Sequence, residues 1–131
     1  MYSLKIMQMF YNPKNVGLVK SPSASGEIKN LETSEIIKFT AKIEDETIKE
    51  IKFKAFGNAL LIALASLTTE LVKGKNINEL ENLTAEDVLE QADEIPYAKT
   101  YCADMIEQGL KALKINYDFK QEKLQKKVGK E

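Results

Sequence analysis

The stretch IKFTAKIEDETIKEIKFKAFGN, residues 37–58, decides the fold of this chain. Apolar residues alternate with lysine and threonine in residues 37–43, and with charged residues in 51–55. A period of two is typical of β-strands with one apolar and one polar face. The polar residues 44–47 between them suit a hairpin turn. Residues 27–29 are a weaker candidate for a third strand, and a sheet with only one apolar face favours helices on a single side.

Helical segments surround the predicted hairpin. Asn58 has the side chain of an N-cap, and the apolar run after it predicts a buried helix that ends before Gly74. Thr84 and Asp87 resemble a capping box with aspartate in place of glutamate, which predicts a short helix. Pro96 suits the first position of a long final helix, because its missing N–H is not needed there. The expected helices cover residues 3–10, 59–73, 85–92 and 96–119.

These elements predict an α+β fold, a two-layer sandwich of three antiparallel strands with helices on one face. The length of 131 residues suits one domain over the whole chain. The first helix should bury Leu4, Met7 and Phe10, which fall on roughly one face. Thr40 should lie on the solvent-facing side of the sheet. The lysine-rich tail after Phe119 is expected to fray.

Composition excludes several kinds of chemistry. The chain has 19 basic residues, all lysine, 20 acidic residues, no histidine and one cysteine, Cys102. It therefore has no Ser-His-Asp or Cys-His nucleophile system, no internal disulfide and no four-ligand zinc site of its own. We expect a cytoplasmic protein that is not an enzyme. A net charge of −1 gives no footprint for nucleic acid or an anionic membrane, and the apolar run 59–67 is too short to span a bilayer.

Two positions have alternative interpretations. Cys102 is near the start of the last predicted helix, where a thiol's pKa falls, but burial as a small apolar residue is commoner and is favoured here. Its neighbours Tyr97 and Tyr101 are expected to pack against the core. Gly57 either lets the backbone approach a bound group or adopts a positive φ, and we favour the turn. Residues 20–26 are small and polar, which predicts a loop.

Several short stretches follow one another in a specific order. They are MYS at residues 1–3, FYNPKNVG at 10–17, GEI at 26–28, IKFKAFG at 51–57, ELVKGK at 70–75, and IPYAK at 95–99 followed by Cys102. In order and spacing they resemble the IscU/NifU family of iron–sulfur cluster assembly scaffolds, from Met1 to about Tyr117. The resemblance implies the same α+β fold and a role in cluster assembly.

The resemblance also implies which residues should hold metal. Members of this family use three cysteines with nearby acidic and histidine ligands to bind a [2Fe-2S] cluster or zinc. At the matching positions this chain has Thr33 and Asn58 for two cysteines and Tyr101 for the histidine. Only Cys102 remains, with Glu35 in place of an aspartate. Because clusters need thiolate or comparable ligands, usually four, we expect no complete metal site and no cluster or zinc in the monomer.

Family partners are the remaining implication. They are a cysteine desulfurase, a frataxin-like protein and a chaperone, and the residues that match their contacts are Tyr2, Ile95, Pro96 and Lys99. Four hypotheses follow: a scaffold relative acting by protein contact, a persulfide carrier through Cys102, a metal site shared across a dimer, and an enzyme on a borrowed fold. The last has no nucleophile motif to support it. The first predicts that the lost ligand positions converge at one end of the molecule.

Overall fold

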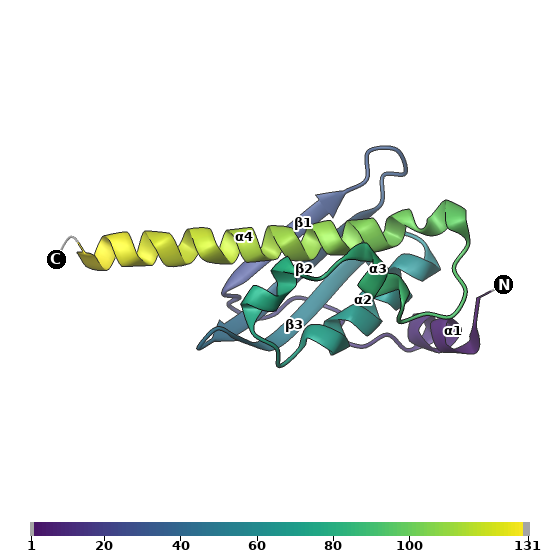
Figure 1. The fold of residues 1–131 in the computed structure, drawn as a ribbon, viewed down its shortest axis with the longest axis horizontal. Coiled ribbons are helices and arrows are strands. Elements are labelled where there is room, and N and C mark those ends of the chain that lie inside the picture. Colours follow the sequence, from purple (N-terminus) through teal and green to yellow (C-terminus); the bar gives the residue numbers. More distant parts are fainter. Residues whose placement is uncertain (1, 130–131) are drawn as a thin grey trace.

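The computed structural model describes residues 2–129 and has the predicted α+β architecture (Figure 1). Three antiparallel strands lie in the order β1-β2-β3. The elements are α1 (Leu4–Tyr11), β1 (Ala24–Lys29), β2 (Ile36–Glu44), β3 (Thr47–Phe56), α2 (Ala59–Val72), the 3₁₀ turn η1 (Ile77–Glu81), α3 (Ala85–Leu89), the 3₁₀ turn η2 (Tyr97–Lys99) and α4 (Tyr101–Gly129).

The hairpin forms as predicted. Glu44 pairs with Thr47, so Asp45 and Glu46 alone make the turn. Their φ angles of 50° and 62° are both positive, which is the geometry of a two-residue turn that matches the twist of the strands. The third strand is longer than predicted, because Ala24–Lys29 pairs with β2. The predicted loop is therefore wrong over its last residues.

Helices α2 and α4 pack on the apolar face of the sheet, as predicted. The alternating residues Ile37, Phe39 and Phe53 are buried beneath them. Two glycines set how closely α4 approaches. A Cβ on Gly26 of β1 would lie 2.5 Å from the carbonyl oxygen of Gly109 on α4, and a Cβ on Gly109 would lie 2.8 Å from the Phe39 ring. Larger residues at either position would push the helix off the sheet.

The opposite face of the sheet is partly covered, which corrects one prediction. The backbone N–H of Gly17 donates to the carbonyl of Phe53 at one edge, and that of Ser23 donates to Ala41 near the other. Between these points the chain crosses the outer face, and the N–H of Val19 donates to Thr40 Oγ1 at 2.9 Å. Thr40 is buried and not solvated, because a segment without strand periodicity covers it.

The first helix buries a different face from the one predicted. Ile6 is buried, while Leu4, Met7 and Phe10 are exposed. The helix is so rich in apolar residues that more than one face looks buried, and its contact with α2 selects the face of Ile6. The prediction of which residues it buries was therefore wrong, although its position was right.

The last helix begins later and continues further than predicted. Pro96 precedes the short turn η2, and α4 begins only at Tyr101. The buried face of α4 includes Cys102, Met105, Ile106, Leu110 and Leu113. The predicted fraying after Phe119 is wrong, since α4 continues as one helix to Gly129 and extends beyond the sheet (Figure 1). The capping box at Thr84 forms as predicted, but α3 ends at Leu89.

Candidate functional site

Three segments distant in sequence meet at the start of α4. The loop before β2 contributes Glu35, the turn between β3 and α2 contributes Asn58, and the first turn of α4 contributes Tyr101 and Cys102. Both the backbone N–H and the side-chain Nδ2 of Asn58 donate to Glu35 Oε2, each at 2.8 Å. The Asn58 side chain also caps α2, since its Oδ1 accepts from two backbone N–H groups in the first helical turn.

The second carboxylate oxygen of Glu35 is also engaged. The hydroxyl of Tyr101 donates to Glu35 Oε1. The amide Nδ2 of Asn58 lies 3.1 Å from Tyr101 Oη and 3.4 Å from Cys102 Sγ. Throughout the described residues, every buried side-chain nitrogen and oxygen has a hydrogen-bond partner. The four side chains therefore form a closed network, which we call the Glu35 network.

Thr33 lies in the same place. Its Oγ1 accepts from the backbone N–H of Glu35 at 3.3 Å. A surface cavity of about 530 Å³ is lined by Thr33, Glu35, Ala55, Phe56, Gly57, Asn58, Lys99 and Tyr101. The structure thus brings together Thr33, Glu35, Asn58, Tyr101 and Cys102, the five positions that the family resemblance singled out.

Residue 57 is a glycine for a different reason from the positive-φ turn that the sequence analysis favoured. Positive φ angles occur at other glycines in the described chain, Gly17 and Gly74. At Gly57 a Cβ would lie 2.5 Å from Glu35 Oε2 and 2.7 Å from the Leu61 side chain. The residue is glycine because the Glu35 carboxylate approaches the backbone, so the prediction of a positive-φ turn was wrong.

The electrostatics of the Glu35 network favour the ionised carboxylate of Glu35 and the protonated forms of Tyr101 and Cys102. Burial raises the pKa of Glu35, but hydrogen bonds from Tyr101, Asn58 and Thr33 outweigh it, and the pKa is lowered overall. The hydrogen bond that Tyr101 donates to Glu35 raises the pKa of Tyr101, and burial raises it to a lesser extent. Burial raises the pKa of the Cys102 thiol. The network therefore contains a carboxylate, a neutral phenol and a neutral thiol near pH 7.

This donor set does not fit a cluster or a zinc ion. Within residues 2–129, no group of three or more cysteine, aspartate, glutamate or histidine side chains lies close enough to hold a metal. Cys102 is 0% exposed and protonated, and both oxygens of Glu35 already accept hydrogen bonds. An amide and a neutral phenol are poor ligands for iron or zinc.

Of the predicted partner-binding residues, Lys99 lies on the same cavity and contacts Tyr2, whereas Ile95 and Pro96 line a separate surface cavity. Lys99 donates from Nζ to Tyr2 Oη at 2.7 Å, with the Nζ 5.3 Å from the Tyr2 ring centre. Pro96 is exposed and Ile95 is half-buried. Two exposed aromatic rings belong to the same region: Tyr97, which lies within the predicted 95–99 segment, and Phe56, which the sequence analysis did not single out.

The two exposed aromatic residues differ in whether their exposure could be predicted from the sequence. Tyr97 is 92% exposed and does not pack on the core, which corrects its prediction. Phe56 is 77% exposed and lines the cavity. Its position follows from the alternation of β3, because Phe56 has the parity of the outward-facing Lys52 and Lys54. The signal for Phe56 was therefore in the sequence.

Residues 1–124 match the NifU-like N-terminal domain. The chain belongs to this family. It is 33% identical over 126 residues to the iron–sulfur cluster assembly scaffold protein IscU 1 of Archaeoglobus fulgidus, which covers 96% of this chain and 82% of that protein. It is also 33% identical over 125 residues to the IscU scaffold protein of Escherichia coli, across 92% and 97% of the two chains.

Solved structures have the same fold. A protein described as an iron–sulfur cluster assembly scaffold for the SUF system, from Fervidobacterium islandicum, superposes with a TM-score of 0.62. It is 20% identical and covers 88% of this chain and 96% of its own. The IscU/NifU-like sandwich predicted from the sequence is confirmed. Among residues 2–129, no helix has the length and apolarity needed to cross a membrane.

Proposed function

We propose that this protein acts in iron–sulfur cluster assembly by binding assembly partners, without holding a cluster itself. Its scaffold-named relatives support the general role. The observation that carries the specific role is the Glu35 network, in which the groups at the ligand positions are hydrogen-bonded to one another. Groups already paired in this way gain little from binding a metal that prefers thiolates.

The contact surface we propose surrounds that network. It consists of six residues, of which Phe56, Pro96 and Tyr97 are exposed and Tyr2, Ile95 and Lys99 are half-buried. Exposed aromatic rings beside a cation are typical of protein interfaces. The partners proposed are a cysteine desulfurase, a frataxin-like protein or a chaperone, and the single reduced thiol favours action in the cytoplasm. The role needs no catalytic group of its own.

One experiment tests both halves of the proposal. The chain is incubated anaerobically with a cysteine desulfurase, cysteine and ferrous iron, and then gel-filtered and analysed for iron and sulfide. We expect coelution with the desulfurase and iron below one-tenth of an equivalent. Stoichiometric iron and sulfide on the isolated chain would contradict the proposal. So would the absence of a complex when the gel filtration is repeated with a desulfurase, a frataxin-like protein and a chaperone in turn.

A matched variant makes the result interpretable. The double variant Thr33→Cys/Asn58→Cys places two thiols beside Cys102 at the positions where the family has cysteine. We expect this variant to take up iron or zinc under conditions where the parent does not. Metal uptake by the variant alone shows that the assay detects a site and that the parent lacks one.

The structure contradicts the conditions for two other hypotheses. A persulfide carrier needs an accessible thiolate, whereas Cys102 is fully buried and its pKa is raised. A metal shared across a dimer needs Cys102 and Glu35 to reach another chain, whereas the first is buried and the second is held by Asn58 and Tyr101. We therefore propose neither.

A further inference from the structure

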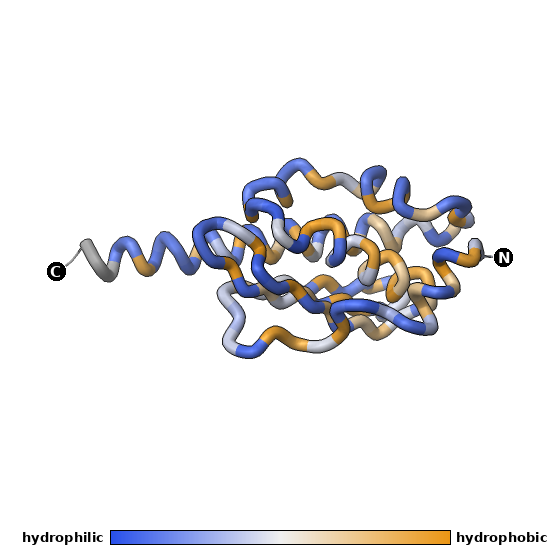
Figure 2. The backbone as a smooth tube through the Cα atoms, turned by 90° about the horizontal axis from the view of Figure 1, so that it is seen from below, coloured by the Kyte–Doolittle hydropathy of each residue, from blue (hydrophilic) through white to orange (hydrophobic). Residues whose placement is uncertain are grey.

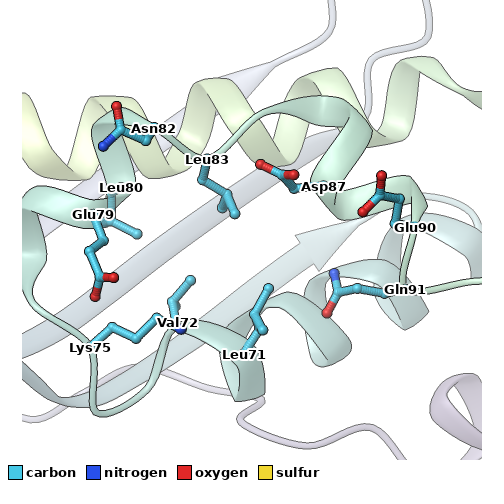
Figure 3. A pocket seen from close by; sticks show the side chains of 10 residues that line it. All are labelled: Leu71, Val72, Lys75, Glu79, Leu80, Asn82, Leu83, Asp87, Glu90 and Gln91. Atoms are coloured by element: carbon cyan, nitrogen blue, oxygen red, sulfur yellow. The ribbon is translucent and has the colours of Figure 1, made fainter.

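A groove lies between the end of α2 and the segment that contains η1 and α3, outside the Glu35 network (Figure 3). Its volume is about 440 Å³. Leu71 and Val72 on α2 point toward Leu83 on the facing connection, and Leu80 completes the apolar floor. Leu71 is exposed and Leu83 is half-buried, so the groove is open to an apolar side chain from outside.

The rim of this groove is acidic. Glu79, Asp87 and Glu90 line it, opposed by Lys75. They belong to a segment, residues 76–98, that contains no lysine and the following acids: Glu79, Glu81, Glu86, Asp87, Glu90, Asp93 and Glu94. Because the whole chain has a net charge of only −1, the remaining residues are net positive. Negative charge is thus concentrated in residues 76–98, and the rest of the chain has net positive charge.

Two of the rim carboxylates have fixed positions. Glu79 Oε2 accepts from the backbone N–H of Asn76, and Asp87 Oδ2 accepts from that of Thr84, at 3.2 and 2.9 Å. Both are parts of capping boxes that begin η1 and α3. Because these hydrogen bonds already hold the two carboxylates in place, an ion pair with either of them costs little further ordering.

The far end of α4 has the complementary chemistry. The buried stripe of α4 passes through Leu113 and Tyr117 and returns to the same helix face at Leu124, beyond the sheet. Leu124 is 57% exposed, and Lys120 lies one turn before it. Figure 2 shows this part of the helix as mostly hydrophilic with an isolated apolar position. Lys120, Lys123 and Lys126 give it a basic character.

We propose that the groove binds the far end of α4 from a second copy of this chain, with Leu124 against Leu71 and Leu83 and lysines against the acidic rim. The helix cannot reach the groove of its own chain. Lys114 Nζ lies 3.0 Å from Glu81 Oε1, which fixes α4 beside η1, and beyond that point the helix runs away from the body (Figure 1). An amphipathic basic helix in an apolar groove with an acidic rim is an established mode of recognition.

Sedimentation velocity of the full chain over a concentration series tests this proposal. At low salt we expect the weight-average mass to rise with concentration toward that of a dimer or larger assembly. Because lysine–carboxylate attraction at the rim is screened, about 0.5 M salt should weaken the association about tenfold. A chain that remains monomeric at every concentration and salt would overturn the proposal.

Matched variants locate the contact. Leu124→Asp lies outside the core and should reduce association about tenfold, because it removes the apolar anchor. Leu31→Asp is the control, since Leu31 is 87% exposed at the other end of the sheet and should change nothing. Equal association of the parent and Leu124→Asp would overturn the assignment of the anchor.

Mixing two variants tests the contributions of the groove and of the α4 helix separately. Leu71→Asp disrupts the groove but leaves α4 intact, whereas Leu124→Asp does the reverse. Each variant alone should associate about tenfold more weakly than the parent, and an equimolar mixture should regain association through one intact groove and one intact helix. Circular dichroism melting of both variants excludes unfolding as the cause. A mixture that stays monomeric at concentrations where the parent associates would contradict the proposal.

Discussion

The two ends of α4 differ in where their polar groups are directed. At the first turn, Tyr101 and Cys102 face inward and join Glu35 and Asn58 in hydrogen bonds that close on themselves. At the far end, Leu124 and the lysines around it face solvent. One helix thus has an end whose polar groups are held by other segments and an end whose polar groups are exposed, where Lys126 pairs with Glu122 of the same helix. The comparison indicates that a residue's ability to bind a ligand depends on whether its polar groups are already paired within the chain. Its position in the family's fold is not enough.

The largest expected effect comes from breaking the closed end at its centre. Asn58→Ala removes the cap of α2 and the side-chain amide that donates to Glu35 Oε2, and should lower the free energy of unfolding by about 3 kcal/mol. Urea denaturation measures this. Asn76→Ala is the matched control, because Asn76 caps η1 without contacting a buried network. Its cost should be about 1 kcal/mol. Equal losses in the two variants would show that the network adds nothing beyond capping.

A smaller loss should follow from crowding the same end. Gly57→Ala places a methyl group against Glu35 Oε2 and Leu61, and should cost about 2 kcal/mol. The Glu35→Ala background removes the carboxylate that the methyl group meets. In that background we expect the cost of Gly57→Ala to fall by about half, as measured by a double-mutant cycle in urea. Additive losses would argue against a clash with Glu35.

Removing one hydroxyl sharpens the comparison further. Tyr101→Phe deletes the donor to Glu35 Oε1 and should cost about 1.5 kcal/mol, since the acceptor is charged. Tyr117→Phe serves as a control, because it removes a hydroxyl on the same helix outside the network.

The melting temperature of the parent should not change when zinc or a chelator is added, because the network and not a metal joins the three segments. A rise in the parent's melting temperature on addition of zinc would contradict this prediction.

The pH dependence gives a smaller effect with a defined sign. The pKa of Glu35 is lower in the folded chain than in an unfolded one, so folding favours the carboxylate. Its stabilisation is present above the unfolded pKa and is lost as pH falls through the folded value. The difference in unfolding free energy between the parent and Glu35→Gln should therefore shrink from neutral pH toward pH about 3. A difference that grows on acidification would reverse the sign assigned to Glu35.

The smallest effect belongs to the open end. Leu124→Asp should change the free energy of unfolding by less than about 0.5 kcal/mol, because Leu124 contacts no part of the core. The same variant should weaken self-association strongly. Stability and association therefore separate at this end, whereas at the Glu35 network every change lowers stability. A loss above about 1 kcal/mol for Leu124→Asp would show that α4 is stabilised along its whole length by the core.

Much of the fold follows from local pattern. Alternation of apolar and polar residues located β2 and β3, because each residue's side is set by the geometry of a strand. Asn58 was recognised as a cap from its side chain and its position before an apolar run. The convergence of Glu35, Asn58 and Tyr101 followed from the family resemblance and not from spacing, since the three are far apart in the chain.

What escaped prediction depends on contacts between distant segments. Thr40 is buried by a passing loop, Ile6 by α2, and Gly57 is crowded by a carboxylate 22 positions earlier in the chain, at residue 35. None of these partners leaves a periodic signal beside the residue it affects. The start of α4 was missed for another reason: Pro96 is compatible with a helix start and equally with the short 3₁₀ turn that it precedes.

The close approach of Gly26 and Gly109 has a consequence for the order in which the chain folds. The hairpin of β2 and β3 is local and forms from neighbouring residues, but β1 is covered only by a helix encoded near the other end of the sequence. During synthesis, the apolar side of β1 therefore stays uncovered until residues of α4 leave the ribosome, whereas α2 can already pack on β3. We expect the nascent chain to depend on delayed compaction or on a chaperone until Gly109 has emerged, as contacts of high sequence separation form last.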